Sequence, residues 1–316
     1  TTIPIDAYVT MLFNAAIDTL ILWVTVKWHP IRCFSFKRLK SLLSYGWKLL
    51  LSSLIDTVYN DLRQLIIGKI YTSSDLAQYN QGKKFPQFIV TNINSAIDSV
   101  LLPTMSKEQD NRNVVKNITR RAIKTSTYIM MPLMVGLAMC ADTLVPLLLT
   151  NKWVPCVPFL RIFCFTYAFF PVHTANLNAI KAMGRSDLFL ILEIIKKVIG
   201  ILAIILTMKI SVLAMAYSLL ATSVLSQIIN SFPNKNLLNY SYIEQLKDML
   251  PQIVLSVFMG VVVYSIQFLK LGNVATLAIQ IPIGIFIYLF GSIIFKIDSF
   301  EYLVQTISNL ILKKKF

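Results

Sequence analysis

Lysine and arginine residues lie inside long apolar segments of this chain, where a charge is unusual. A charged side chain at membrane depth is costly, so it normally faces a water-filled cavity or a partner group. No acidic residue lies within four positions of Lys83 or Lys84. We expect such cations to line a cavity that receives an anionic or polyhydroxylated ligand. The candidate binding residues are Arg63, Lys83, Lys84, Arg161, Lys196 and Lys197.

Acidic and amide side chains accompany these cations. Asp56, Asn60 and Arg63 are spaced by four and three residues, which places them on one face of a helix. Asn94 and Asp98 are four residues apart on the next apolar segment. We expect Asp56, Asn60, Asn94 and Asp98 to line the polar cavity.

Each of these sets also has a purely structural interpretation. Glu193 can form a local ion pair with Lys196 or Lys197, three and four residues later. Asp56 and Arg63 can neutralise each other, and asparagine and serine side chains can form hydrogen bonds between helices. The sequence leaves both kinds of interpretation open.

The sequence shows no pattern of a hydrolytic, ATP-driven or metal-dependent site. It contains no HExxH motif, GxSxG elbow, P-loop or glycine-rich dinucleotide turn. The four cysteines (Cys33, Cys140, Cys156 and Cys164) lack metal-binding spacing, and burial as small apolar side chains explains them. We therefore expect neither an enzyme nor a bound metal or cofactor.

The elements that position the polar residues are predicted to be membrane-spanning helices. Of 316 residues, 56% are hydrophobic and only 14% are charged. About 20 apolar residues in a helix cross a hydrocarbon core roughly 30 Å thick. The sequence predicts an all-α polytopic membrane protein with about nine spans, at residues 7–26, 42–70, 76–102, 122–149, 156–180, 187–208, 211–231, 249–269 and 273–295.

The net charge of +15 is distributed unevenly between the two sets of loops. Nineteen lysines and arginines fall on one side of the predicted spans and four on the other. By the positive-inside rule the richer side is cytoplasmic, which places the C-terminus in the cytoplasm. Residues 300–312, followed by three lysines, are predicted to form an interfacial amphipathic helix or a basic topological anchor.

Several different short motifs lie along the second to sixth predicted spans. Residues 60–71 end in a Gly-Lys turn, and residues 76–79 resemble a Leu-Gly-x-Tyr helix start in which Ala77 replaces glycine. Residues 99–106 contain a proline before a basic loop, and residues 131–137 read Met-Pro-Leu-Met-Val-Gly-Leu. Residues 147–153 resemble a Leu-Leu-x-Gly-x-x-Trp turn without its glycine, and residues 179–185 end in Ala-Met-Gly-Arg.

In their order and spacing these motifs resemble the bacterial oligosaccharide and polysaccharide flippases of the multidrug/oligosaccharidyl-lipid/polysaccharide exporter superfamily. The resemblance implies two six-helix lobes, often followed by two additional helices. On this chain it assigns residues 1–26 to the last helix of a first lobe and 27–41 to a cytoplasmic linker. It then assigns 42–231 to the second lobe, 249–295 to the additional pair and 296–316 to a basic cytoplasmic tail.

The same resemblance implies an activity and partners. The protein would flip undecaprenyl-diphosphate-linked oligosaccharides across the bacterial inner membrane by alternating access, for lipopolysaccharide, capsule or exopolysaccharide synthesis. The partners it implies are this lipid-linked saccharide, the bilayer, and polysaccharide polymerase and chain-length proteins, with no nucleic acid. Since the chain starts at Thr1 with one span before the second lobe, we expect an N-terminally truncated fragment.

Other activities remain as alternatives. A cation-coupled multidrug exporter would need acidic residues in the cavity, where this chain has more lysine and arginine than acid. A lipid II flippase of the same superfamily is a closer competitor. A membrane-embedded polysaccharide polymerase or acyltransferase would normally carry a large external loop or a histidine–carboxylate site, and His173 has no acidic neighbour in sequence.

Overall fold

A computed structural model describes residues 5–26, 35–269 and 271–313. Within these ranges the structure is helical and contains no strand, which confirms the predicted all-α class. The elements are α1 (Ile5–Val26), α2 (Phe36–Ile70), α3 (Ser73–Lys107), α4 (Arg112–Met139), α5 (Ala141–Leu149), the 3-10 helix η1 (Asn151–Cys156), α6 (Val157–Ala168), α7 (Phe170–Ala182), α8 (Ser186–Thr207), α9 (Val212–Leu238), α10 (Tyr242–Ser265), the 3-10 helix η2 (Ile266–Leu269), α11 (Asn273–Ile294) and α12 (Asp298–Lys313).

The chain divides into two compact units, Thr1–Ser44 and Tyr45–Phe316. The first contains α1, whose side chains from Leu12 to Val26 are exposed. The second unit contains the helices from α3 to α12 and most of α2, and all of the contacts described below lie within it.

Five helical segments of the described chain are long and apolar enough to cross a membrane. They are Arg112–Met139, Asn151–Ala182, Val212–Leu238, Tyr242–Leu269 and Asn273–Ile294. The chain is therefore a multi-pass membrane protein. Helices α2, α3 and α8 are not among these five segments, so the number of nine spans stays a prediction.

Two of the predicted spans are interrupted in the structure. The span predicted at 122–149 divides at Cys140 into α4 and the short α5, and α4 begins at Arg112 rather than at residue 122. The span predicted at 156–180 divides at Phe169 into α6 and α7. Pro171 is the second residue of α7, and proline is favoured in the first turn of a helix because it has no backbone N–H to donate.

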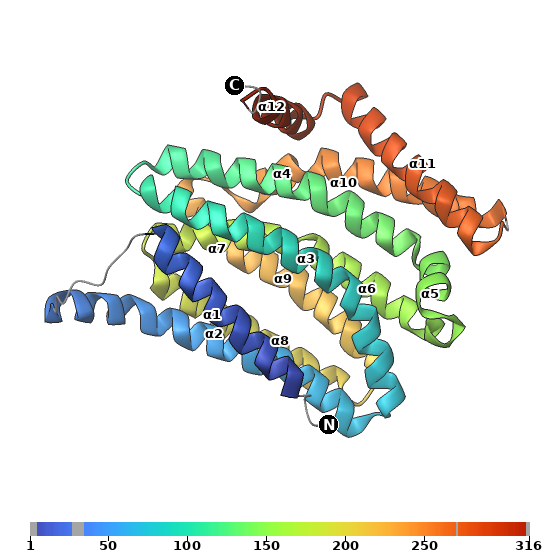
Figure 1. Cartoon of the computed structure of the whole chain (residues 1–316), viewed down its shortest axis with the longest axis horizontal. Helices are drawn as coiled ribbons and strands as arrows, with labels where there is room; N and C mark the ends of the chain where they lie inside the picture. The colour runs from blue at the N-terminus through green and yellow to red at the C-terminus, as the bar shows by residue number, and fades with distance from the viewer. Residues whose placement is uncertain (1–4, 27–34, 270, 314–316) are drawn as a thin grey trace. The chain divides into compact units, whose positions relative to one another are not determined.

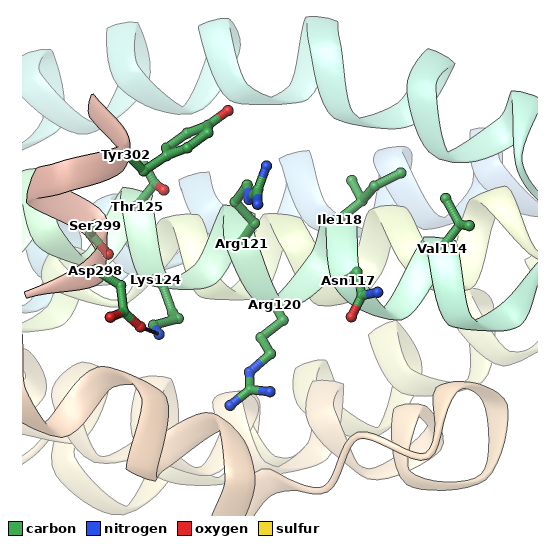
Figure 2. A pocket seen from close by; sticks show the side chains of 10 residues that line it. All are labelled: Val114, Asn117, Ile118, Arg120, Arg121, Lys124, Thr125, Asp298, Ser299 and Tyr302. Atoms are coloured by element: carbon green, nitrogen blue, oxygen red, sulfur yellow. Dashed lines mark hydrogen bonds and ion pairs between the residues drawn. The ribbon is translucent and has the colours of Figure 1, made fainter. Parts of the chain in front are cut away.

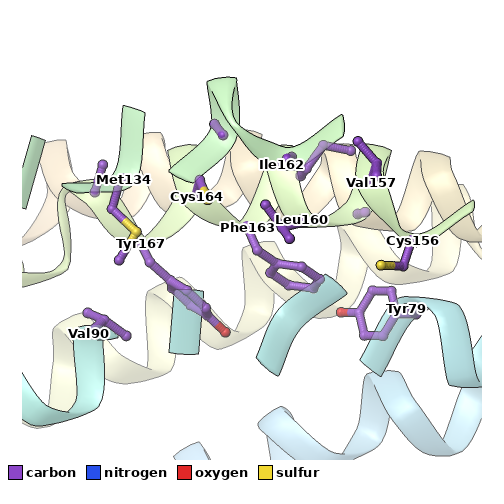
Figure 3. Close-up of a cluster of buried hydrophobic side chains, with 14 of the residues drawn as sticks. Tyr79, Val90, Met134, Cys156, Val157, Leu160, Ile162, Phe163, Cys164 and Tyr167 are labelled. Carbon is purple, nitrogen blue, oxygen red and sulfur yellow. The ribbon is translucent and has the colours of Figure 1, made fainter. Parts of the chain in front are cut away.

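Helices α3, α4, α6, α7, α9 and α10 pack side by side in the second unit (Figure 1). Their core is formed mainly by α3, α4 and α6, where Tyr79 packs edge-on against Phe163 with ring centroids 5.1 Å apart (Figure 3). Gly82 allows this close packing, because a Cβ atom there would lie 2.6 Å from Cβ of Phe159. Small residues are common at helix contacts in membranes for this reason.

The loops that the sequence assigns to one membrane side lie together in the structure. At one end, Lys116 near the start of α4 donates to the carbonyl oxygen of Asn239 after α9. At the other end, Tyr71 Oη donates to the carbonyl oxygen of Met208 over 2.9 Å, which joins the α2–α3 turn to the end of α8. This grouping agrees with the alternation predicted from the charges.

Candidate translocation residues

Arg63 on α2 is the most buried of the predicted cations, with 4% of the residue exposed. Its Nη1 donates to the carbonyl oxygen of Met215 and, over 3.1 Å, to Oγ of Ser218, both on α9. Its Nη2 is also buried and has no hydrogen-bond partner among the described residues. A guanidinium offers five donors in a fixed fork, so this side chain still has donor capacity for an anion.

Lys83 and Lys84 lie in the first half of α3, where Lys83 is half-buried and Lys84 is exposed. Tyr79, one turn earlier on the same helix, is 2% exposed and belongs to the core. Neither lysine forms an ion pair with any carboxylate in the part of the chain that the structure describes. Their charges are thus available to a ligand on this side of α3.

Lys196 and Lys197 on α8 share one carboxylate. Glu193 Oε1 lies 2.5 Å from Nζ of Lys196, and Oε2 lies 3.8 Å from Nζ of Lys197. The Lys197 ammonium also lies over the ring of Tyr59 on α2, 4.4 Å from its centroid. The local ion pair considered as an alternative from the sequence is therefore present, and it contains two cations for one acid.

Asn94 and Asp98 join α3 to α7 by two hydrogen bonds one turn apart. Thr174 Oγ1 donates to Oδ1 of Asn94 over 2.7 Å, and Asn178 Nδ2 donates to Oδ1 of Asp98 over 2.8 Å. Both residues lie on α3, on the same helix as Lys83. The side chains of Asp56 and Asn60 lie outside the described residues.

Arg161 binds groups on helices α4, α5 and α10. It sits on α6, where Nη2 binds the carboxylate of Asp142 on α5 and Nε donates to the carbonyl oxygen of Ala138 over 3.2 Å. Its guanidinium is also 5.9 Å from the ring centroid of Tyr264 on α10. These contacts hold α4, α5, α6 and α10 together, which gives Arg161 a structural role.

Sequence reasoning missed a buried amide network between α7, α9 and α10. Asn176 and Gln245 exchange two hydrogen bonds of 2.9 and 3.0 Å, and Asn234 Nδ2 donates to Oδ1 of Asn176 over 2.7 Å. All three residues are 0% exposed. One feature of the sequence could have predicted this network. Four polar residues spaced by three and four positions lie on one face of α9: Gln227, Asn230, Ser231 and Asn234.

His173, which has no acidic neighbour in sequence, has an amide partner on α9. Its Nδ1 lies 3.1 Å from Nδ2 of Asn230, and its ring meets that of Phe170 edge-on. No group of three or more histidine, cysteine or acidic residues in the described ranges could hold a metal ion. Cys140, Cys156 and Cys164 are buried as free thiols, and Cys33 lies outside the described residues.

Comparison with known proteins gives this arrangement a family context. Residues 8–158 match the protein family described as "Polysaccharide biosynthesis protein". The chain is 25% identical to the teichuronic acid biosynthesis protein TuaB of Bacillus subtilis (strain 168) over 162 residues, covering 51% of this chain and 34% of the relative. It is 22% identical to the lipopolysaccharide biosynthesis protein WzxC of Escherichia coli (strain K12), covering 82% of this chain and 55% of the relative.

A solved structure shows the same fold. The lipid II flippase MurJ in an inward closed conformation superposes with a TM-score of 0.69 and 19% sequence identity, covering 89% of this chain and 59% of MurJ. The chain spans between about a third and just over half of the curated relatives named here. The resemblance to polysaccharide exporters that the motifs predicted is confirmed.

Proposed function

Because the chain resembles polysaccharide exporters and folds like a flippase, we propose that it is part of a carrier for lipid-diphosphate-linked oligosaccharides. The carrier moves these units across the bacterial cytoplasmic membrane for the synthesis of a surface polysaccharide. It performs transport rather than covalent chemistry. The family match at residues 8–158 supports this substrate class over lipid II, since a fold alone is shared by proteins of different function.

The observation that carries the proposal is the buried guanidinium of Arg63 with its unpaired Nη2. The substrate's diphosphate bears negative charge, and moving it through a medium of low dielectric constant requires a compensating cation. Arg63 is buried on α2 and has an unpaired Nη2 donor. A guanidinium binds phosphate oxygens through two parallel hydrogen bonds, which lysine does not provide.

Alternating access gives Arg63 a route to the substrate. In the described conformation Arg63 binds α9 through Met215 and Ser218. Separation of α2 from α9 would release Nη1 while Nη2 is already unpaired. Rocking of one lobe against another is the general mechanism of carriers built from two repeats. Lys83 and Lys84 would then extend the cationic path along α3, and Asn94 and Asp98 would provide hydrogen-bonding groups for sugars.

The orientation follows from the loop charges. With the nine predicted spans, nineteen of the lysines and arginines fall on the same side as the C-terminal tail, and the positive-inside rule makes that side cytoplasmic. The diphosphate headgroup would enter from this side and leave on the side that contains Lys69 and Lys152. The polymerase and chain-length proteins of the pathway would use the exported unit.

Complementation tests the proposal. The gene that encodes this chain, with any coding sequence upstream of Thr1, is deleted in its host and restored as wild type, Arg63→Ala, Arg63→Lys, or Lys83→Ala with Lys84→Ala. We expect the deletion to abolish a surface glycan and wild type to restore it. A charge-assisted hydrogen bond contributes roughly 1.5–3 kcal/mol, so Arg63→Ala should lower export about ten- to hundredfold. Arg63→Lys should retain part of the activity.

Lys107→Ala is the matched control, because Lys107 is an exposed lysine at the end of α3. All variants are compared at equal abundance in isolated membranes. Unchanged surface glycan in the deletion strain would reject the transport proposal. Full activity of both Arg63→Ala and the double lysine variant would keep transport and reject the cationic path.

A further inference from the structure

A pocket of about 560 Å³ lies between the first half of α4 and the beginning of α12 (Figure 2). It is separate from the residues assigned to translocation, which lie on α2, α3 and α8. The pocket is lined by Val114, Asn117, Ile118, Arg120, Arg121, Lys124, Thr125, Asp298, Ser299 and Tyr302. Three of these ten side chains are cationic and one is acidic, so the lining favours an anion.

Two of the three cations are already paired with carboxylates. Arg120 forms a bidentate pair with Asp248 on α10, with both N–O distances at 2.7 Å. Lys124 Nζ lies 2.5 Å from Oδ2 of Asp298 on α12. These two pairs tie α10 and α12 to α4, and they leave little charge for a ligand.

Arg121, the third cation of the pocket lining, differs from Arg120 and Lys124 in its partner. Its guanidinium lies over the ring of Tyr302, 4.5 Å from the centroid, and it forms no ion pair with any carboxylate in the described part of the chain. Figure 2 shows Arg121 and Tyr302 side by side at the pocket. Stacking fixes the plane of the guanidinium while its edge stays open for hydrogen bonds. Asn117, Thr125 and Ser299 supply neutral donors in the same pocket.

The surface of α4 beyond Thr125 is apolar. Ile129 and Leu133 follow Thr125 at intervals of four residues, and residues four apart are neighbours on the helix surface. Ile129 is 37% exposed and Leu133 is 45% exposed. An anionic group on Arg121 would therefore be adjacent to a surface suited to acyl chains, which favours a lipid over a free ion.

We propose that this pocket binds the phosphate group of an anionic phospholipid in the leaflet that the start of α4 faces. Arg121 makes the charged contact, and Asn117, Thr125 and Ser299 donate hydrogen bonds to the remaining phosphate oxygens. Tyr302 holds Arg121 in place, so the lipid also links α12 to α4. Anionic lipids attract basic groups near the membrane surface by about 1 kcal/mol per charge. The proposal does not require that the chain transports a saccharide.

Native mass spectrometry of the full chain in an uncharged detergent tests the proposal. The protein is offered phosphatidylglycerol, phosphatidylcholine or inorganic phosphate, and the bound fraction is measured as the ligand concentration is varied. We expect one phosphatidylglycerol to bind at least about tenfold more tightly than phosphatidylcholine, which corresponds to 1.4 kcal/mol. Arg121→Gln should remove this preference, while Lys107→Gln, with the same change in net charge, should keep it.

A second pair of variants protects the test against misfolding of Arg121→Gln. Asn117→Glu places a carboxylate at an exposed pocket position one turn before Arg121, where it would neutralise the guanidinium and repel phosphate. Asn113→Glu is its control, since Asn113 is exposed on α4 and does not line the pocket. We expect the first variant to lose phosphatidylglycerol and the second to retain it.

Three results would overturn the proposal. Equal binding of phosphatidylglycerol and phosphatidylcholine would show that the phosphate charge of an anionic lipid is not recognised. Displacement of phosphatidylglycerol by millimolar inorganic phosphate would make the site a free-phosphate site. Retention of the lipid in both Arg121→Gln and Asn117→Glu would place the lipid elsewhere on the protein.

Discussion

Two groups of cations in this protein differ in what their charges bind. The first group lies within the helices of the second unit: Arg63 binds a backbone carbonyl and a hydroxyl of α9, and Lys196 and Lys197 share Glu193 on their own helix. The second group lies at the start of α4, where Arg120 and Lys124 each bind a carboxylate on a different helix.

The partner of a buried or half-buried cation determines whether the cation joins two helices or keeps a net positive charge. A cation paired with a carboxylate on another helix joins the two helices, so Arg120 and Lys124 hold α10 and α12 against α4. A cation that binds neutral groups keeps its net charge in the interior. Arg63 is in this position, since it binds Met215 and Ser218 on α9. The proposed transport role therefore rests on Arg63, whereas Arg120 and Lys124 could bind a moving anion only by releasing a helix.

The largest expected effect is that of Glu193→Gln. Glu193 is 7% exposed, and its carboxylate offsets two ammonium groups whose side chains are 11% and 13% exposed. Removing one member of a buried ion pair leaves an uncompensated charge, and we expect a loss of about 3 kcal/mol in the free energy of unfolding. Denaturant unfolding in detergent measures this loss. Glu301→Gln, at an exposed position of α12, should change it by less than about 0.5 kcal/mol.

Asp248→Asn tests the second group and should have the next largest effect. Asp248 accepts hydrogen bonds from Arg120 and, over 2.9 Å, from Oη of Tyr240. Because the Arg120 side chain is 51% exposed, we expect a loss of about 2 kcal/mol, in the range for hydrogen bonds to a charged group. A double-mutant cycle with Arg120→Gln should give a coupling free energy of about 1 kcal/mol. Strict additivity would show that the pair does not form in the membrane.

Gly200→Ala tests the contact between α2 and α8 beside the first group. A Cβ atom at Gly200 would overlap Oη of Tyr59, whose ring lies under the Lys197 ammonium. We expect the displaced ring to lower stability by about 1 kcal/mol or more, as overpacking does. Gly136→Ala is the control, because the nearest atom to its Cβ would be Cε of Met259 at 3.8 Å. Since alanine favours a helix over glycine, the control should be neutral or stabilising.

The smallest expected effect is a pH dependence of the α4–α12 pair. The Lys124 ammonium lowers the pKa of the Asp298 carboxyl below its ordinary value. A carboxyl whose pKa is lowered by folding stabilises the protein above its unfolded pKa and loses this contribution as the pH falls through the folded pKa. The Asp298 side chain is 77% exposed, so Lys124→Gln should cost less than about 1 kcal/mol at pH 7. The difference between wild type and variant should vanish in acid below the folded pKa; a difference that persists there would assign it to other contacts of Lys124.

The helices that the sequence predicted best are the strongly apolar ones. The spans predicted at 211–231, 249–269 and 273–295 each fall, to within one residue, inside a single candidate membrane segment of the structure. The break at Cys140 was not predicted, because residues 122–149 are apolar on both sides of it. Hydropathy indicates whether a segment lies in an apolar environment. It therefore does not detect a break between two helices when both are apolar.

The contacts of the candidate site also differ in how far the sequence could predict them. Glu193 with Lys196 and Lys197 could be proposed from spacing, because residues three and four apart meet on one helix whatever the fold. Spacing could not predict the pair Arg161–Asp142 or the pair Asn176–Gln245. Each of these pairs joins two different helices, and their contact is set by tertiary packing. From sequence alone Arg63 and Arg161 were equal candidates for ligand binding. In the structure Arg63 binds a carbonyl and a hydroxyl group, whereas Arg161 binds a carboxylate.

The amino-acid sequence by itself determined that the protein is an all-α membrane protein, and it predicts how the loops alternate between the two membrane sides. Segment length, apolar composition and the placement of lysine and arginine act locally, against the membrane rather than against other parts of the chain. Only the tertiary structure decided which charges are neutralised and which keep a free donor, because this depends on side chains more than a hundred residues apart, such as Arg63 with Ser218 and Arg120 with Asp248.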